Sequence, residues 1–589
     1  MLRRILTPLA LVGVLCAALP AGTQAAEPQV PTQVPPRRST QLADGFGMNV
    51  SLPREPRLPW STRWWTRMFD SGVKWLRIGQ YENSSERTSW DWIEQTPGHY
   101  AVTEDLDEAI RSLADNGVSI EIELQYSNPL YEGSPASRPR RVILPRPGIG
   151  QNDEPPNPIF IPPATDEQMA AFIRYVHFMV NRYKGVVKYW ELWNEENIGY
   201  WQPQTKNKEQ LVEKARAYGR LLARFADAVH DTDPEAKVIT GGTASPDLLF
   251  VRTALAAAAP KVDIVAYHTY PGFGSNHMPE EMDLAEHAAY FREQIMHVPG
   301  IRHQVEFWDN EWNVSPLWKD CNESVQARYV PRFYLYTLAQ HVRGAMWTFI
   351  PGTDGNEDDL YGVLHGDTRK PDAFQPREAY KSFSVVSALF GQTAIDPMAE
   401  FSVADVPTAY QHGQLQAYAF RDRKTHQLIY AVWLAVQSEA ADSSVPIPVS
   451  LRVPEKSLPN PILIDVRTGS VTSLRWKSQG VLGIPLKDSV VAVADASYLD
   501  WPVVPEAPAE LRAARDHSGV GLEWKTYGHA RRVEVQRSVA YGPWIEVVTL
   551  KPETEKYSDA RVPAGHVTYR VRAVGEKGAS AWSNPAWVD

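Results

Sequence analysis

Two acidic segments carry the residues best suited to chemistry. They read Tyr189-Trp-Glu-Leu-Trp-Asn-Glu-Glu-Asn197 and Gln304-Val-Glu-Phe-Trp-Asp-Asn-Glu-Trp-Asn313. Each resembles a β-strand that ends in a carboxylate, Glu195 in the first segment and Glu311 in the second. Cleavage of a glycosidic bond needs two carboxyl groups, one to protonate the leaving oxygen and one to attack the anomeric carbon or activate water. The two segments supply such a pair.

The residues around the pair follow the alternation of a strand, in which every second side chain points to the same face. This alternation predicts that Glu191, Trp193 and Glu195 share a face. Glu191 and Asp309 would lie deeper than the pair, and we expect structural hydrogen bonds for both. Three tryptophans lie in these segments or in the loop after the first of them: Trp201, Trp308 and Trp312. The sequence leaves open whether they line sugar subsites.

The pair must be positioned by a larger framework. From Gly45 to about Gly391, short β-rich runs alternate with helical patterns, the clearest being Ala164–Tyr183 and Lys208–His230. This alternation favours an α/β fold with parallel strands, and eight such units predict a (β/α)8 TIM barrel at 44–392. The expected strands are Phe46–Leu52, Val73–Gln80, Ser119–Tyr126, Val187–Glu195, Lys237–Thr243, Asp263–Tyr270, Gln304–Glu311 and Gly344–Ile350. A doubly wound open sheet is the alternative, disfavoured because no Gly-rich phosphate-binding segment follows the first strand.

One connection within the barrel region is unusually long. The segment 138–163, after the third strand, is rich in Pro and Arg. Long barrel loops are usually functional, and those that follow strands rise on the face where barrel enzymes keep their sites. We expect this loop to form one wall of the substrate cleft.

Two β-rich units follow the barrel. Short strands and turns at 393–503 predict an antiparallel β-sandwich, in which Pro448 marks a strand at the edge of its sheet. Residues 504–589 alternate around Trp524, Tyr557 and Tyr569, and this unit resembles a fibronectin type III domain, a second β-sandwich.

The N-terminal region predicts export. Two arginines, an apolar stretch and small residues make 1–26 a secretory signal peptide, and the Pro-rich segment 27–43 reads as a flexible leader. We therefore expect a secreted protein, periplasmic or extracellular, with no membrane span. Removal of the signal peptide leaves Cys321 alone, so no intramolecular disulfide can form.

Composition narrows the class of partner. The net charge is −10 without long runs of either sign, which argues against nucleic acid as a partner. The chain has 20 Trp residues, whose flat faces suit sugar rings, although most are expected in cores. A carbohydrate is the expected partner, and the oligomeric state is left open.

The motifs resemble a known group of enzymes. A fourth strand ending in Trp-Asn-Glu and a seventh ending in Glu are similar to clan A of the glycoside hydrolases, and the Glu-Trp-Asn suffix and following sandwich are similar to family 39. The segment Gln125–Tyr131 resembles the exopolysaccharide-hydrolase branch of that family. The resemblance covers about 45–500. It implies a retaining enzyme for β-linked sugars, with Glu195 as acid/base and Glu311 as nucleophile.

The resemblance also implies supporting residues. Arg77 would hold the nucleophile ionised, Asn194 would bind the sugar 2-hydroxyl, and the others would contact nucleophile or sugar; they are Asn128, His268, Tyr270 and Trp347. Of the three tryptophans named above, Trp312 is kept as a candidate substrate-binding residue, without support from the resemblance. Where clan A usually has proline after the acid/base, this chain has Glu196. That carboxylate would either raise the pKa of Glu195 by like-charge repulsion or point to solvent.

Alternatives to this interpretation remain open. The barrel could be an inactive carbohydrate-binding or adhesion module, or the enzyme could act from chain ends like a β-xylosidase; Ser127–Tyr131 favours endo action. No cofactor is implied and no metal site is expected. The acidic run Asp354–Asp359 lacks the spacing of a calcium loop and reads as a solvated loop.

Overall fold

The computed structural model describes residues 30–50, 63–79, 88–131, 160–284, 286–301, 305–348, 361–367, 370–410, 413–441 and 445–589. Eight parallel strands form its centre: β1 (Gly47–Asn49), β2 (Trp75–Ile78), β5 (Ser119–Leu124), β6 (Tyr189–Leu192), β7 (Lys237–Ile239), β9 (Ile264–His268), β10 (Glu306–Trp312) and β11 (Val342–Met346). The ring closes because β11 pairs with β1 and β9 pairs with β10. The predicted (β/α)8 barrel is therefore confirmed, and an open sheet is excluded.

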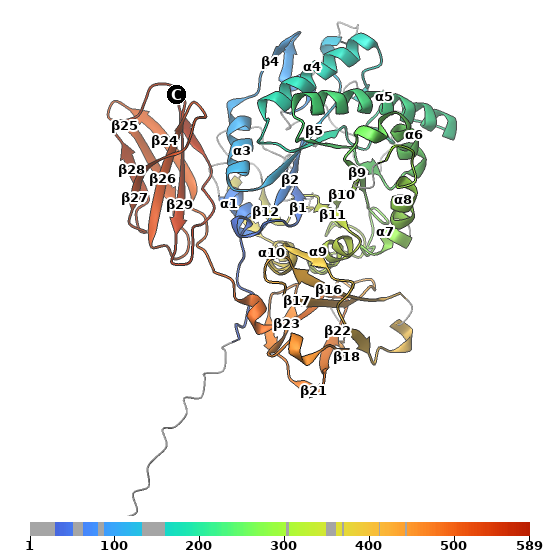
Figure 1. The fold of residues 1–589 in the computed structure, drawn as a ribbon. Helices are drawn as coiled ribbons and strands as arrows, with labels where there is room; N and C mark the ends of the chain where they lie inside the picture. The colour runs from blue at the N-terminus through green and yellow to red at the C-terminus, as the bar shows by residue number, and fades with distance from the viewer. Residues whose placement is uncertain are drawn as a thin grey trace, which may run out of the picture.

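Helices surround the strands (Figure 1). The main ones are α1 (Arg63–Asp70), α3 (Glu104–Asp115), α4 (Asp166–Arg182), α5 (Lys208–Thr232), α6 (Leu248–Ala258), α8 (Ala288–Ile295), α9 (Glu323–Ala339) and α10 (Glu378–Phe390). Polar caps fix where several begin: Thr165 and Gln168 form a capping box on α4, and Asn207 caps α5. The two helices expected from the sequence thus agree with α4 and α5 within two residues at each end.

The barrel interior has an apolar floor beneath a polar layer. The floor is a separate hydrophobic cluster of Trp75, Tyr189, Ile239, Ile264, Ala266, Trp308 and Ala345. Several of these residues lie at the first positions of their strands, and the tryptophan rings of β2 and β10 pack 4.8 Å apart. Glu311 and His268 lie at or near the other ends of β10 and β9. Polar side chains therefore gather at the C-terminal face, where barrel enzymes place their sites.

An antiparallel sandwich packs below the barrel in Figure 1. Its larger sheet has the order β14 (Thr393–Ile395), β16 (Leu415–Asp422), β17 (Leu428–Leu434), β23 (Val491–Asp495), β19 (Pro461–Asp465) and β20 (Val471–Ser473). Its smaller sheet has the order β15 (Ser402–Ala404), β18 (Ile447–Arg452), β22 (Val481–Leu486) and β21 (Trp476–Ser478). Buried side chains of the larger sheet join the same hydrophobic cluster as α9 and α10, so this sandwich packs on the barrel.

Pro448 does not mark an edge strand, contrary to expectation. Its strand, β18, lies between β15 and β22. However, β15 pairs only with Ser450–Arg452, so Pro448 has no neighbour on that side, and across β22 it faces Pro485. The missing N–H therefore breaks no pairing with β15 at this position.

The C-terminal unit is a second sandwich beside the barrel (Figure 1). One sheet has the order β24 (Ala509–Asp516), β25 (Gly519–Lys525) and β28 (Lys556–Asp559). The other has the order β27 (Ile545–Leu550), β26 (Arg532–Val539), β29 (Val567–Val574) and β30 (Ala586–Val588). Trp524 and Tyr569 are buried in a hydrophobic cluster that consists of residues of this unit alone.

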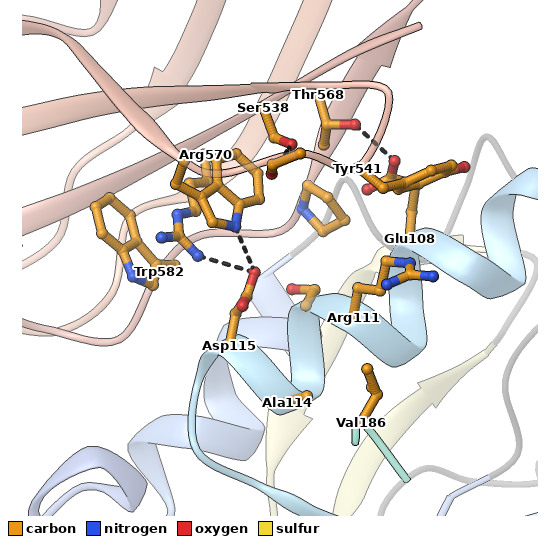
Figure 2. A pocket seen from close by; sticks show the side chains of 14 residues that line it. Glu108, Arg111, Ala114, Asp115, Val186, Ser538, Tyr541, Thr568, Arg570 and Trp582 are labelled. Carbon is orange, nitrogen blue, oxygen red and sulfur yellow. Dashed lines mark hydrogen bonds and ion pairs between the residues drawn. The ribbon is translucent and has the colours of Figure 1, made fainter. Parts of the chain in front are cut away.

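This terminal sandwich contacts α3 of the barrel at several points, and Arg570 makes one of them (Figure 2). The Arg570 guanidinium lies over the rings of Trp544 and Trp582, 3.9 and 4.1 Å from their centroids. It also pairs with Asp115 at the end of α3 at 2.9 Å. A cavity of about 210 Å³ lies at this contact, and none of its lining residues belongs to the predicted carboxylate pair.

The segment 30–43 differs from the flexible leader expected for it. The Val34 amide donates to the Gly469 carbonyl at 2.8 Å, and Arg38 pairs with Asp70 of α1 at 2.7 Å. Val34 and Arg38 are both buried. Backbone pairing and a buried ion pair therefore hold a segment whose prolines suggested only mobility.

Candidate active site

Arg77 of β2 lies at the centre of the polar layer, and its side chain is fully buried. Nε and Nη2 donate to the two Glu191 carboxylate oxygens at 2.7 and 3.1 Å, and Nη1 donates to Glu311 Oε2 at 3.0 Å. Nη2 also donates to Asn194 Oδ1 at 3.1 Å. Burial alone would lower the pKa of Arg77, but Glu191, Glu123 and Glu311 outweigh it and raise that pKa well above its usual value. Arg77 is therefore a permanent cation bound to Glu311.

Glu195 reaches the layer from a turn that follows β6. The strand ends at Leu192, and Trp193 and Glu195 then adopt positive φ angles of 73° and 45°. The Glu195 amide donates to the Gly241 carbonyl at 3.0 Å, which fastens the turn to the segment after β7. The carboxyl group of Glu195 is thus presented by a constrained loop and not by the strand itself.

Two residues near the end of β9 connect the pair. His268 Nδ1 lies 3.0 Å from Glu195 Oε1 and 3.6 Å from Glu311 Oε2, while the Tyr270 hydroxyl donates to Glu311 Oε1 at 2.9 Å. One carboxylate oxygen of Glu195 and one of Glu311 lie within 4.8 Å of each other. The structure therefore brings together four residues predicted from the sequence, Glu195, Glu311, His268 and Tyr270, with Arg77 and Asn194 beside them.

Burial sets the protonation of the connecting groups. It raises the pKa of Glu195 to about 7, although Arg77 acts in the opposite direction. It lowers the pKa of His268 to about 4, although Glu311 opposes the shift. Near neutral pH the imidazole is therefore uncharged, while Glu195 can hold or release a proton.

Two further carboxyl groups of this layer were not anticipated. Glu121 and Glu123 of β5 are fully buried, and Glu123 Oε2 lies 3.1 Å from Arg77 Nη2. Asn310 donates to Glu121 Oε1 and Glu191 Oε1, at 2.8 and 3.0 Å. The alternation Ser119-Ile-Glu-Ile-Glu-Leu124, with two glutamates on one face of an otherwise apolar strand, was the available signal.

Glu196 follows neither expectation for it. Its side chain is buried, not solvated, and burial raises its pKa well above the usual range. Burial also accounts for the raised pKa of Glu195, without a contribution from Glu196. A Cβ atom at Gly241 would overlap the Glu196 carboxyl group, so Glu196 packs against the loop that holds Glu195.

The two tryptophans predicted on these faces lie elsewhere. Trp193 does not share the face of Glu191, because the positive-φ turn directs its ring against Trp201, 4.9 Å away. Trp312 was expected to contact substrate, but its ring stacks on Phe333 of α9 at 4.4 Å and is 1% exposed. It follows Glu311 directly, so strand alternation turns it outward into the helix layer.

The remaining predicted residues have different positions. Asn128 Nδ2 donates to the carbonyl groups of Trp90 and Glu94 at 3.3 and 2.7 Å, so its amide fastens a neighbouring segment and does not face the pair. Trp347 is buried and directly follows β11. It lies two residues after Ala345, which belongs to the barrel floor, so strand alternation places both side chains on the interior face. Most of the loop 138–163 and all of Asp354–Asp359 lie outside the described residues.

A metal ion is disfavoured at the pair. Glu195, His268 and Glu311 have the spacing of metal ligands. However, the Arg77 guanidinium lies 3.0 Å from Glu311, where it would repel a cation. Among the described residues a second such group, Glu104, His566 and Asp589, lies between α3 and the terminal sandwich. There the imidazole already contacts both carboxylates.

Comparison with known proteins supports the fold. No protein-family model matches the chain, and no curated protein does. A family 39 glycoside hydrolase from Bacteroides cellulosilyticus WH2 is similar in structure, with a TM-score of 0.56, 18% identity, and coverage of 78% of this chain and 82% of the other. A family 51 α-L-arabinofuranosidase from Bifidobacterium longum has a TM-score of 0.46 and 12% identity, with coverage of 79% of this chain and 96% of the other. A glucosidase from Croceicoccus marinus has a TM-score of 0.40 and 14% identity, with coverage of 93% of this chain and 96% of the other. The chain therefore shares the fold of the family 39 glycoside hydrolase.

Proposed function

We propose that the protein is a retaining glycoside hydrolase that cleaves β-linked glycosides by double displacement. The observation that carries this proposal is the 4.8 Å limit on the separation of carboxylate oxygens from Glu195 and Glu311. Retaining enzymes keep their two carboxyl groups about 5–5.5 Å apart, whereas inverting enzymes leave about 6.5–9.5 Å for a water molecule. An upper limit of 4.8 Å between one oxygen of each group favours the retaining arrangement, in which Glu311 attacks the sugar directly.

The two carboxyl groups have environments suited to different steps. Arg77 and Tyr270 bind the two oxygens of Glu311, which attacks the anomeric carbon as a carboxylate. Glu195 gives its proton to the leaving oxygen as the glycosidic bond breaks. Glu195 then accepts a proton from water, and the resulting hydroxide displaces Glu311 from the glycosyl-enzyme. Asn194, whose oxygen accepts from Arg77, has its amide N–H groups available for the sugar 2-hydroxyl.

The assignment is tested by removing the nucleophile. Glu311→Ala should abolish turnover of any β-linked aryl glycoside or polysaccharide that the wild type cleaves, while circular dichroism shows a folded protein. Glu306→Gln is the matched control, because Glu306 is exposed at the opposite end of β10 and glutamine can still accept from Trp308. Near-normal activity of Glu311→Ala would show that another group is the nucleophile.

The stereochemistry of the product gives an independent test. Proton NMR during the first minutes of hydrolysis should show product of the same anomeric form as the substrate. Product of the opposite form would contradict double displacement. Binding of β-glycans without hydrolysis of any of them would instead favour the inactive carbohydrate-binding module.

We also propose export and a fibronectin type III-like terminal domain. The three-plus-four strand arrangement of 509–588 supports the domain, since seven-stranded sandwiches of this kind are common in cell-surface modules. Export is supported by the composition of 1–26, and N-terminal sequencing of the protein secreted by its host tests it. In the part of the chain that the structure describes, no helix is long and apolar enough to cross a membrane.

A further inference from the structure

A chain of aromatic rings runs from the candidate site to the protein surface. Tyr270, which donates to Glu311, lies 5.9 Å from the ring of Phe273. Phe273 lies 5.0 Å from the ring of Trp318, and Trp318 lies 5.9 Å from that of Tyr361. We call Phe273, Trp318 and Tyr361 the aromatic strip. Its residues come from segments after β9, β10 and β11, so the strip lies at the catalytic end of the barrel.

The strip is held by backbone contacts between two loops. Ser275 and Lys319 form a parallel bridge, the Lys319 amide donates to Gly274, and the Asn276 amide donates to Lys319, at 3.2 and 3.0 Å respectively. Phe273 lies between Gly272 and Gly274, whose φ angles are 59° and 89°. The loop conformation therefore presents the phenylalanine at a fixed place.

Tyr361 is anchored in the same region. Its carbonyl group accepts from the Asn313 side chain at 2.8 Å and from Gln326 of α9 at 3.1 Å. Asn313 lies two residues after Glu311, so the far end of the strip is tied to the segment that carries the nucleophile. Both ends of the strip are thus fixed relative to the carboxylate pair.

One residue of the strip and one residue next to it in the sequence are exposed, whereas Trp318 and Tyr361 are half-buried. The Phe273 side chain is 54% exposed and the adjacent Leu317 is 53% exposed, although both belong to well-connected loops. Exposed apolar groups that lie together commonly mark a binding surface. A pyranose ring has an apolar C–H face and polar edges, so it can cover an aromatic ring while its hydroxyl groups stay in water.

We propose that the aromatic strip binds a sugar ring next to the one attacked by Glu311, and that the enzyme therefore selects oligomeric over single-residue substrates. This inference rests on the proposed function. Continuity with the pair through Tyr270 identifies the occupant, because a substrate bound at Glu311 that extends past Tyr270 reaches Phe273. The strip thus makes chain length a determinant of catalytic efficiency.

Two probes that differ only in chain length test the proposal. One is a β-glycosyl fluoride, which carries a single sugar ring and a leaving group without a ring. The other is a β-linked oligosaccharide of three to six residues of the same sugar, chosen from gluco-, xylo-, manno- and galacto-series by wild-type activity. Phe273→Ala should lower kcat/KM for the oligosaccharide by about tenfold and change that for the fluoride by less than about twofold. Trp318→Ala should act in the same way.

Matched variants separate this role from a structural one. Phe273→Tyr keeps the ring and should retain wild-type selectivity. Tyr290→Ala removes an aromatic side chain on α8 that is 56% exposed, and it should leave kcat/KM unchanged for both probes. Equal loss on both probes, or no loss with Phe273→Ala, would overturn the strip proposal while leaving the glycosidase assignment intact. Failure of the wild type to cleave any probe would instead count against the proposed function.

Discussion

At the residue scale, the guanidinium group of one arginine contacts several buried carboxyl groups. Arg77 contacts Glu191, Glu123 and Glu311, and these groups are almost completely withdrawn from water. Burial raises the pKa of Glu123 well above its usual range, with Glu191 and Glu311 adding to the shift while Arg77 opposes it. Burial thus favours the protonated form of Glu123, although the Arg77 guanidinium lies beside it.

Removing this cation should destabilise the whole barrel. We expect Arg77→Met to lower the free energy of unfolding by about 3–5 kcal/mol at pH 7, because buried carboxylates lose their partner. The loss should be smaller at pH 5, where protonation can neutralise them. Urea denaturation at both pH values measures it. Arg216→Met, at an exposed ion pair on α5, is the control and should change stability by less than about 0.5 kcal/mol. A similarly small effect of Arg77→Met would contradict the central role of this residue.

The raised pKa of Glu195 predicts a pH profile. The first step needs the protonated acid, so kcat/KM for an oligosaccharide should fall by about tenfold per unit above pH 7. In Glu195→Gln this decline should disappear together with most of the activity. A β-glycosyl fluoride needs little help from an acid, so its first step should survive in Glu195→Ala, and azide should release the sugar as a β-glycosyl azide. An unchanged alkaline decline in Glu195→Gln would assign it to another group.

At the scale of elements, the loop after β6 decides where the acid lies. Its amide at Glu195 is fixed to Gly241, and a Cβ atom at Gly241 would overlap both the Leu192 carbonyl and the Glu196 carboxyl group. Both contacts belong to the segment that carries Glu195. The placement of the acid therefore depends on the absence of a side chain on the adjoining segment.

A single methyl group should disturb this placement. We expect Gly241→Ala to lower kcat by at least about tenfold, because small displacements of a catalytic group are costly. The fluoride, whose first step depends little on the acid, should lose less than the oligosaccharide. Gly521→Ala in the terminal sandwich is the control, since its Cβ would meet only the Ala514 carbonyl at 3.8 Å. Equal losses on the two substrates would indicate general damage to the site.

The sequence predicts the strands better than the direction of each side chain. All eight barrel strands agree in position with the expected runs, because short apolar runs between helical patterns are a strong signal. Trp193 was misplaced because positive φ angles end the alternation before Glu195. Trp312 was misplaced although strand alternation puts it on the face opposite Glu311, where its ring packs on Phe333 of α9. The contact of Glu123 with Arg77 depends on the pairing of β5 with β2, which brings two strands from separate parts of the sequence side by side.

At the scale of the whole molecule, the terminal sandwich is held to the barrel by charge. His566 contacts Glu104, Glu108 and Asp589, at 2.6, 2.7 and 3.2 Å. The hydrogen bond with Glu108 is the main cause that raises the pKa of His566 to about 9; burial opposes it, and Asp589 and Glu104 add to it. The imidazolium therefore contributes to the contact below about pH 6.5, and that contribution is lost as pH rises through 9.

This pH dependence of the His566 contribution can be measured by thermal unfolding. His566→Gln should lower the temperature at which the terminal sandwich separates or unfolds at pH 6, and the difference from wild type should shrink at pH 10. His529→Gln changes an exposed histidine of the same sandwich and should have no effect at either pH. A difference that stays constant between pH 6 and pH 10 would show that the charge on His566 does not matter.

The buried N-terminal segment has a consequence for the order in which the molecule can be completed. Its partners include the backbone at Gly469 and Val504, which are made more than four hundred residues later. During translation these two contacts can therefore form only after most of the protein exists, whereas the pairing of Arg38 with Asp70 can form early. Truncated chains that end before residue 469 should therefore leave the backbone around Val34 open to proteases.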